Sequence, residues 1–290
     1  MGIHNKIYSC LLAMLSVLPV AAERSVQGGD IVMELPVNAD RWNCKATFRT
    51  QTSTSLGAGQ VRLLDQYLSD NMYQGVAFNF NREITLGLKR HSNMWSYFYY
   101  SLTYAPTYDY SKSSITHYLM FHFDYTHYFK CFQNARFSIL AGPGVYFDFG
   151  GLYKPSNSNN PAQLKSNLSL SASLQASYRF RIKNYPMSIR YNMNIAMLGV
   201  MFAPDYGMLY YEWFMLDQDR YAGSFAWWGN SWAMIHKFSI DFYTSRKVQL
   251  RLSYTAGFDG YRMNDLESRL NSHIISLGII LRRAYLAVQK

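Results

Sequence analysis

The chain has 290 residues, enough for one large β domain, and only 16% of them are charged, against roughly a quarter in ordinary soluble domains. The formal charge is +10, but the basic residues are spread along the chain and form no dense run. The even spread of the basic residues argues against a nucleic-acid-binding protein, as does the start of the chain, which resembles an export signal.

The first 22 residues have the pattern of a secretory signal peptide. Lys6 supplies a positive start, residues 7–20 are mostly apolar, and small residues precede a cleavage site after Ala22. The apolar run is too short for a membrane anchor. We therefore expect residues 1–22 to be removed, residues 23–43 to form a short periplasmic extension, and residues 44–290 to form the folded domain.

Two cysteines, Cys44 and Cys131, would remain after cleavage. They could form a disulfide in an oxidising compartment, or stay as two separate thiols, and their spacing does not decide between these outcomes.

Long stretches of alternating apolar and polar residues dominate the rest of the chain. In 167–182, Leu, Ala, Tyr and Phe fill one face while Asn, Ser, Gln and Arg fill the other, and 76–89, 119–129, 187–197 and 248–259 repeat this pattern. Alternation with period two indicates β-strands, and these runs exceed the usual five or six residues. A soluble β-sandwich is the alternative, but its water-facing side would carry more Lys and Glu. The pattern predicts an all-β, transmembrane, antiparallel up-and-down β-barrel, which must close because hydrocarbon cannot satisfy a free strand edge.

About ten strands are expected, at residues 44–58, 73–90, 95–108, 115–130, 134–150, 165–183, 186–202, 231–244, 247–260 and 271–286. An even number places both termini on the periplasmic side. Short connections at 91–93, 131–133, 183–185 and 245–246 would be periplasmic turns, and longer ones at 59–72, 151–164, 203–230 and 261–270 would be outer loops. A further strand at 209–216, paired near Phe225, would make twelve.

Aromatic residues suggest two kinds of surface. Those expected at the membrane interfaces, where amphipathic rings are favoured, include Trp95, Tyr97, Tyr128, Tyr146, Tyr153, Tyr178, Trp232, Tyr243 and Tyr285. The longest outer loop holds a second set, a candidate binding surface for a glycan, a lipid or a protein, formed by Tyr206, Tyr210, Tyr211, Trp213, Trp227 and Trp228. The alternative is that this second set belongs to the upper aromatic girdle.

Three segments, NSNNPAQLKSNLSL, YRFRIKNYPMSIRYN and GVMFAPDYGMLYYEWF, carry a family resemblance. They resemble an uncharacterised outer-membrane β-barrel family, a domain of unknown function of Bacteroidota-type bacteria. The resemblance runs from about Thr50 to the C-terminus. It implies an outer-membrane location and assigns no catalytic or ligand residue.

Charged residues on the polar faces should meet inside the barrel. We predict that they pair across the lumen, which is then filled or narrowed to a small pore. This predicted lumen charge network comprises Arg49, Glu83, His122, Asp124, Arg136, Arg179, Arg181, Arg190, Asp241 and Arg251.

Three patterns in the sequence are candidate catalytic sites. His91 and Ser92 are adjacent, so on a strand they would point to opposite faces and could not act as base and nucleophile. His122 and Asp124 share a face but have no convincing nucleophile beside them. Asp217 and Asp219 could belong to a protease at the outer rim, but loop acids are usually only solvated.

The sequence thus favours a non-enzymatic integral outer-membrane barrel, for surface binding or narrow passive transport, located in the cell outer membrane. An outer-membrane hydrolase, resembling a lipid A deacylase, a phospholipase or a rim protease, is the alternative. No metal, phosphate or cofactor motif is present in the sequence, so no cofactor is expected. Expected partners are outer-membrane lipid and lipopolysaccharide, the barrel-assembly machinery, and a surface glycan or protein ligand.

Overall fold

The computed structural model describes residues 31–32, 47–87, 94–158, 160–183, 185–205, 207, 223–244 and 248–284. No helix in these ranges is long and apolar enough to cross a membrane. The strands are β1 (Ile31–Val32), β2 (Thr47–Asp65), β3 (Ser69–Gly87), β4 (Met94–Asp109), β5 (Ile115–Gln133), β6 (Phe137–Tyr153), β7 (Ala162–Ile182), β8 (Tyr185–Phe202), β9 (Gly223–Trp227), β10 (Ser231–Phe242), β11 (Val248–Met263) and β12 (Leu266–Ala284).

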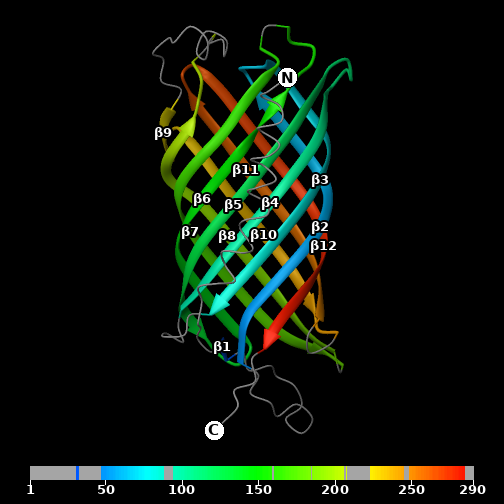
Figure 1. The fold of residues 1–290 in the computed structure, drawn as a ribbon, viewed down its shortest axis with the longest axis vertical. Helices are drawn as coiled ribbons and strands as arrows, with labels where there is room; N and C mark the ends of the chain where they lie inside the picture. The colour runs from blue at the N-terminus through cyan, green and yellow to red at the C-terminus, as the bar shows by residue number, and fades with distance from the viewer. Residues whose placement is uncertain are drawn as a thin grey trace, which may run out of the picture.

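Ten of these strands close into the predicted antiparallel barrel. Their order is β2-β12-β11-β10-β8-β7-β6-β5-β4-β3, and pairing of β3 with β2 completes the ring. The strands wind obliquely around a tall barrel (Figure 1). Strand β2 begins and β12 ends at its lower end in Figure 1; we call the opposite end, with the β2–β3 and β11–β12 turns, the outer end.

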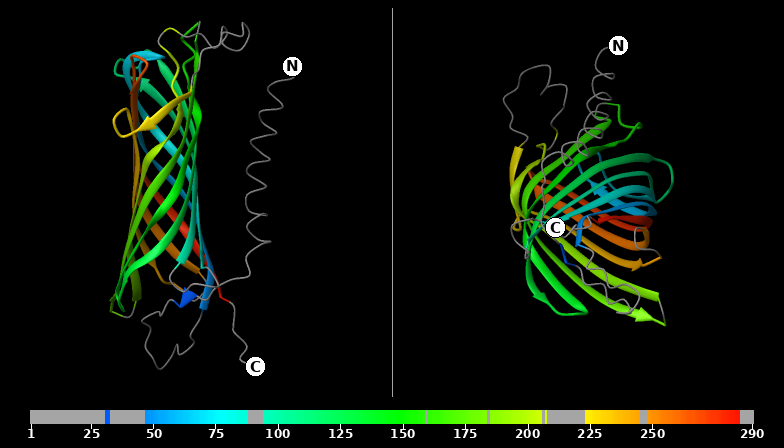
Figure 2. Two further views of the ribbon diagram at one scale, coloured as in Figure 1. Left: turned by 90° about the vertical axis from the view of Figure 1, so that its left-hand side faces the viewer. Right: turned by 60° about the horizontal axis from the view of Figure 1, so that its bottom comes forward.

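The remaining two strands lie off the ring, and neither makes a twelve-stranded barrel. Strand β1 pairs with the first residues of β2. Strand β9 pairs with residues 198–202 of β8, whereas β10 pairs with residues 187–195 of the same strand. Strand β9 therefore continues the line of β10 beyond a break at residues 228–230, visible beside the barrel wall in Figure 2. The proposed strand at 209–216 lies outside the described residues.

The outward faces carry an apolar belt, as the alternation predicted. Outward-pointing side chains such as Leu56, Phe78, Leu170, Ile275 and Leu277 are exposed, while the inward faces hold Ser, Asn and charged residues. This is the polarity of a membrane barrel, where lipid covers the outside.

Near the outer end this polarity reverses. Val61 and Leu63 on β2 point inward and are buried, whereas Arg62 between them is exposed. On β11, Tyr261 and Met263 are likewise buried inside. The outer end thus has an apolar interior and a polar surface, the arrangement of a protein region in water.

Two predicted outer loops are wrong because of this reversal. Residues 59–72 and 261–270 continue as strand and end in tight turns of three and two residues. Asn264 and Asp265 both have positive φ, the conformation that a two-residue hairpin turn requires. Because the apolar residues change sides there, the alternation is not continuous with the belt, and the sequence pattern alone predicts a loop.

Several predicted interface aromatics also occupy other positions. Tyr97, Tyr128 and Tyr146 point into the lumen and are buried, because they lie in register with the polar face of their strands. Tyr153 and Tyr178 are exposed on the outside, as predicted, and Tyr285 lies outside the described residues.

The cysteine prediction stays untested. Cys131 is an exposed free thiol near the lower end of β5, and Cys44 lies outside the described residues. The predicted signal peptide and most of the 23–43 extension also lie outside them.

Glycines allow neighbouring strands to approach closely in the barrel wall. A Cβ added at Gly59 would lie 1.9 Å from the carbonyl oxygen of His273 on β12. We expect Gly59→Ala to lower the free energy of unfolding by about 1–3 kcal/mol, because the obstructing atom belongs to the backbone. Urea unfolding in detergent micelles measures this. Gly223→Ala on β9 is the control, since nothing lies within 4 Å of its added Cβ. Equal midpoints for both variants would contradict the expectation.

Candidate functional site in the barrel lumen

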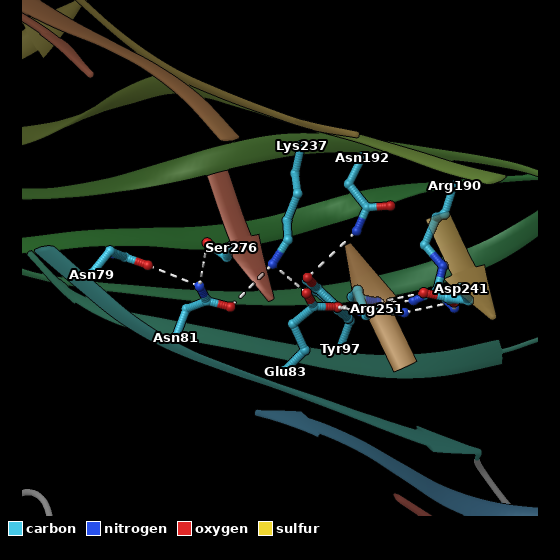
Figure 3. A network of polar contacts seen from close by, with 10 residues as sticks. All are labelled: Asn79, Asn81, Glu83, Tyr97, Arg190, Asn192, Lys237, Asp241, Arg251 and Ser276. Atoms are coloured by element: carbon cyan, nitrogen blue, oxygen red, sulfur yellow. Dashed lines mark hydrogen bonds and ion pairs between the residues drawn. The ribbon is translucent and has the colours of Figure 1, made fainter. Parts of the chain in front are cut away.

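The inward faces of β3, β8, β10 and β11 bring five charged side chains together in the lumen (Figure 3). Glu83 accepts a hydrogen bond from Arg251 Nη1 at 2.6 Å and forms an ion pair with Lys237. Asp241 accepts two hydrogen bonds from Arg251, from Nε at 2.6 Å and from Nη2 at 2.9 Å. Arg251 is therefore held by two carboxylates at once, one of them in the bidentate geometry that suits guanidinium.

Arg190 completes this cluster, which we call the ion-pair layer (Glu83, Arg190, Lys237, Asp241 and Arg251). Its guanidinium lies 3.5 Å from Asp241 Oδ2 and 3.8 Å from Glu83 Oε2. Strands β3 and β8, which carry Glu83 and Arg190, are five strands apart in either direction around the ring. The layer thus crosses the full width of the lumen, and all five of its side chains are buried.

Neutral polar groups widen the layer. Lys237 Nζ also donates to Asn81 Oδ1 at 3.3 Å, and Asn81 donates to Asn79 at 2.8 Å. On the other side, Asn192 donates to the hydroxyl of Tyr97 at 3.4 Å (Figure 3). Buried charges surrounded in this way by hydrogen-bonding partners are far less costly than isolated ones.

A second cluster lies closer to the outer end, around His122 on β5. His122 Nδ1 is 2.6 Å from Asp148 Oδ1, and Nε2 is 2.9 Å from Asp124 Oδ2. The hydroxyl of Tyr146 donates to the other oxygen of Asp148 at 2.6 Å. Both imidazole nitrogens thus face carboxylates, Nδ1 through a hydrogen bond and Nε2 through an ion pair, so neither points freely into the lumen as a base for a substrate would.

A third charged contact joins opposite walls near the outer end. Lys165 on β7 forms an ion pair with Asp65 on β2, and these strands too are five apart around the ring. Lys165 Nζ also donates to Ser268 Oγ at 2.7 Å and to the hydroxyl of Tyr261 at 3.3 Å.

A cavity of about 90 Å³ lies among the second and third clusters. Polar groups on its lining include His122, Asp148, Lys165 and Asp259. Its apolar lining and its tyrosines include Leu63, Tyr118, Met120, Tyr146, Leu152, Tyr261 and Leu270.

An apolar layer lies on the outer side of this cavity. Val61, Leu63, Leu68, Tyr118 and Leu152 belong to one buried cluster, formed by residues near the outer ends of β2, β5 and β6 and by the β2–β3 turn. The β6–β7 connection contacts that turn, where Asn157 Nδ2 donates to the carbonyl oxygen of Leu68 at 2.9 Å. The lumen is therefore layered, with apolar packing at the outer end, the cavity beneath it, and the ion-pair layer further in.

The predicted charge network is in fact two separate clusters. Glu83, Arg190, Asp241 and Arg251 meet in the ion-pair layer, and His122 with Asp124 belongs to the second cluster. Three partners were missing from the prediction, namely Lys237, Asp148 and Lys165. The alternation could have identified them as inward-facing residues. Lys237 lies on the same strand face as Asp241, and Asp148 lies on the same face as Tyr146.

The other predicted network residues lie elsewhere. Arg136 is exposed in the turn at 134–136, because β5 ends at Gln133, so its placement in the lumen network is corrected. Arg179 and Arg181 lie near the lower end of β7, where Arg179 is half-buried opposite Ser188 of β8 and Arg181 is exposed. Arg49 lies near the start of β2, and its side chain is outside the part of the chain that the structure describes.

Two residues of the predicted outer-loop surface can be located. Trp227 on β9 and Trp228 in the following turn are exposed on the outer side of the barrel wall. Trp228 Nε1 donates to the carbonyl oxygen of Ala196 at 2.8 Å, where β8 passes from β10 to β9. Tyr206, Tyr210, Tyr211 and Trp213 lie outside the described residues, as do His91, Ser92, Asp217 and Asp219.

Among the described residues, no group of three or more His, Cys, Asp or Glu side chains is arranged to hold a metal ion.

Solved structures similar to this chain are outer-membrane barrels of different activities. The outer membrane protease OmpT from Escherichia coli has a TM-score of 0.49 and 8% identity, covering 81% of this chain and 97% of that one. The transport unit of the autotransporter AIDA-I from Escherichia coli has a TM-score of 0.43 and 8% identity, covering 87% and 94%. An outer membrane channel from Pseudomonas putida F1 has a TM-score of 0.36 and 9% identity, covering 89% and 100%. Likeness at this level assigns no activity.

A search of curated proteins found no match. The model of one family, described as a protein of unknown function (DUF3316), matches residues 11–290, nearly the whole chain. The chain belongs to this DUF3316 family of proteins of unknown function.

Proposed function

We propose that this protein is a non-enzymatic integral outer-membrane barrel that acts by binding at its outer half and does not form a standing pore. The observation that carries the proposal is the ion-pair layer. Its side chains come from opposite walls, are buried, and pair with one another across the lumen. A solute crossing at this level would have to separate Glu83 and Asp241 from their cations, which leaves buried charges unpaired.

The alternatives receive less support from the same side chains. An open pore would need water where the ion-pair layer lies. A hydrolase using His122 as its base would need one imidazole nitrogen free, and both face carboxylates. The apolar layer near the outer end also occupies part of the lumen, independently of charge.

The aromatic residues on the outer wall support a partner in the outer leaflet. Phe225 and Trp227 on β9 and Trp228 beside it are exposed on the outside of the wall rather than inside the lumen. Rings of this kind are favoured at the lipid headgroups. We therefore propose lipid or lipopolysaccharide as their contact, in preference to a soluble glycan or protein.

Planar-bilayer recording of the purified protein tests the closed lumen. We expect no steady conductance steps at neutral pH, because the ion-pair layer leaves no continuous aqueous path. Insertion is verified separately by the heat-dependent change in gel mobility typical of folded barrels. Regular current steps from protein whose insertion has been verified would refute the proposal and favour the narrow passive pore instead.

A further inference from the structure

The cavity contains one carboxyl group without a hydrogen-bond or ion-pair partner among the described residues. Asp259 on β11 points into it and makes no hydrogen bond or ion pair within the described part of the chain. Every other carboxylate around the cavity is paired, Asp65 with Lys165 and both Asp124 and Asp148 with His122. Inside a barrel such a group is neutral or, when ionised, favours a cation beside it.

The charges around the cavity point the same way. The charged residues that line the cavity, together with their ion-pair partners, are five carboxylates (Asp65, Asp124, Asp148, Asp259 and Glu267) and three basic groups (His122, Lys165 and Arg269). When all of them are ionised, two negative charges remain uncompensated. A cationic ligand would complete this balance, and an anionic one would worsen it.

The aromatic lining suits an ammonium ion in particular. Two protein ammonium groups in the lumen already lie over tyrosine rings that line the cavity. Lys165 is 4.6 Å from the Tyr261 centroid, and Lys237, from the ion-pair layer further in, is 4.7 Å from that of Tyr99. Tyr118 and Tyr146 also line the cavity. Tyrosine faces attract ammonium groups by cation–π interaction, most strongly where water is excluded.

The size and the apolar lining limit what such an ion can carry. Leu63, Met120 and Leu270 form an apolar side of the cavity, suited to a short hydrocarbon group. Its volume of about 90 Å³ is smaller than the roughly 150 Å³ of a cavity that holds benzene. The ligand is thus a few non-hydrogen atoms in size.

We propose that this cavity binds small primary alkylammonium ions, with the ammonium against the Asp259 carboxylate and the alkyl group against the apolar side. The inference rests on the proposed function in one respect only, namely that the barrel acts by binding in its outer half. It names the chemical class of the ligand and the residue that selects it.

Isothermal titration calorimetry of the detergent-solubilised protein tests the proposal, using n-propylammonium with 1-propanol and propanoate as isosteric neutral and anionic probes. We expect saturable binding of propylammonium, and at least roughly tenfold weaker binding of the two probes, because a hydrogen bond to a charged group contributes more than a factor of ten. Equal binding of 1-propanol, a preference for propanoate, or no binding at all would overturn it. These comparisons use the unaltered protein, so their outcome does not depend on whether a variant folds.

The variant Asp259→Asn then assigns the binding to this carboxylate. It should weaken propylammonium binding by at least about tenfold and leave the weak binding of 1-propanol unchanged. Asp265→Asn is the matched control, since Asp265 is exposed in the β11–β12 turn and does not line the cavity. Full affinity in Asp259→Asn would overturn the assignment. Ammonium binding by a barrel that conducts would refute the closed lumen and leave this inference standing.

Discussion

Glu83→Gln is expected to lower the free energy of unfolding by about 3–5 kcal/mol, because it removes one member of a buried ion-pair cluster and leaves the others in place. The ion-pair layer has three cations and two carboxylates, and Glu83 is the only carboxylate among the described residues that forms an ion pair with Lys237. The substitution keeps the size of the side chain, so the loss reports charge rather than packing. Urea unfolding in micelles, followed by tryptophan fluorescence, measures it.

Two comparisons make this expectation specific. Glu267→Gln removes a carboxylate that pairs with Arg269 at the exposed outer end, where such a pair contributes about 0–1 kcal/mol. Adding Lys237→Met to Glu83→Gln removes the cation left without its partner, so the double variant should recover part of the lost stability. A Glu83→Gln variant as stable as Glu267→Gln would show that the layer is hydrated and not a closed barrier.

Leu277→Arg on β12 is expected to lower the free energy of unfolding by about 2–4 kcal/mol in a lipid bilayer, since arginine near the middle of the hydrocarbon is costly. Leu277 points outward, is 69% exposed and lies between Ile275 and Ile279 in the apolar belt. The measurement is reversible urea unfolding in lipid vesicles.

Asn271→Arg provides the matched control on the same strand and the same face. Asn271 is exposed where the outward face becomes polar, next to Arg269 toward the outer end. The same arginine there should cost only about 0–1 kcal/mol, as it does near an interface. If the two variants lost equal stability, the belt assigned to lipid would be placed wrongly.

The number of strands and their closure followed from the sequence because one physical rule applied along most of the chain. Lipid outside and a polar lumen inside produce the alternation seen in 167–182, and that segment became β7 with the faces predicted. The rule fails at the outer end, where Val61 and Leu63 point inward. A one-residue change in the β7–β8 register near Leu170 also changes which residues of β8 face the lumen beyond that point.

The candidate site was only partly predictable for a related reason. Alternation identifies inward residues but not their depth or their partners across the lumen. Glu83 and Arg251 were predicted in one network, yet His122 was placed in the same one although it pairs with Asp124 and Asp148 instead. Depth depends on the stagger between neighbouring strands around the whole ring, which no single segment encodes. The cavity beside Asp259 arises from that stagger as well.

The two ion pairs that join walls five strands apart have a mechanical consequence. A ten-stranded ring without internal contacts can flatten into an ellipse by small changes in the angles between strands. The pairs Asp65–Lys165 and Glu83–Arg190 connect opposite sides at two levels, so flattening or widening along those diameters would stretch or compress them. The barrel should therefore keep its cross-section when the lateral pressure of the surrounding lipid changes.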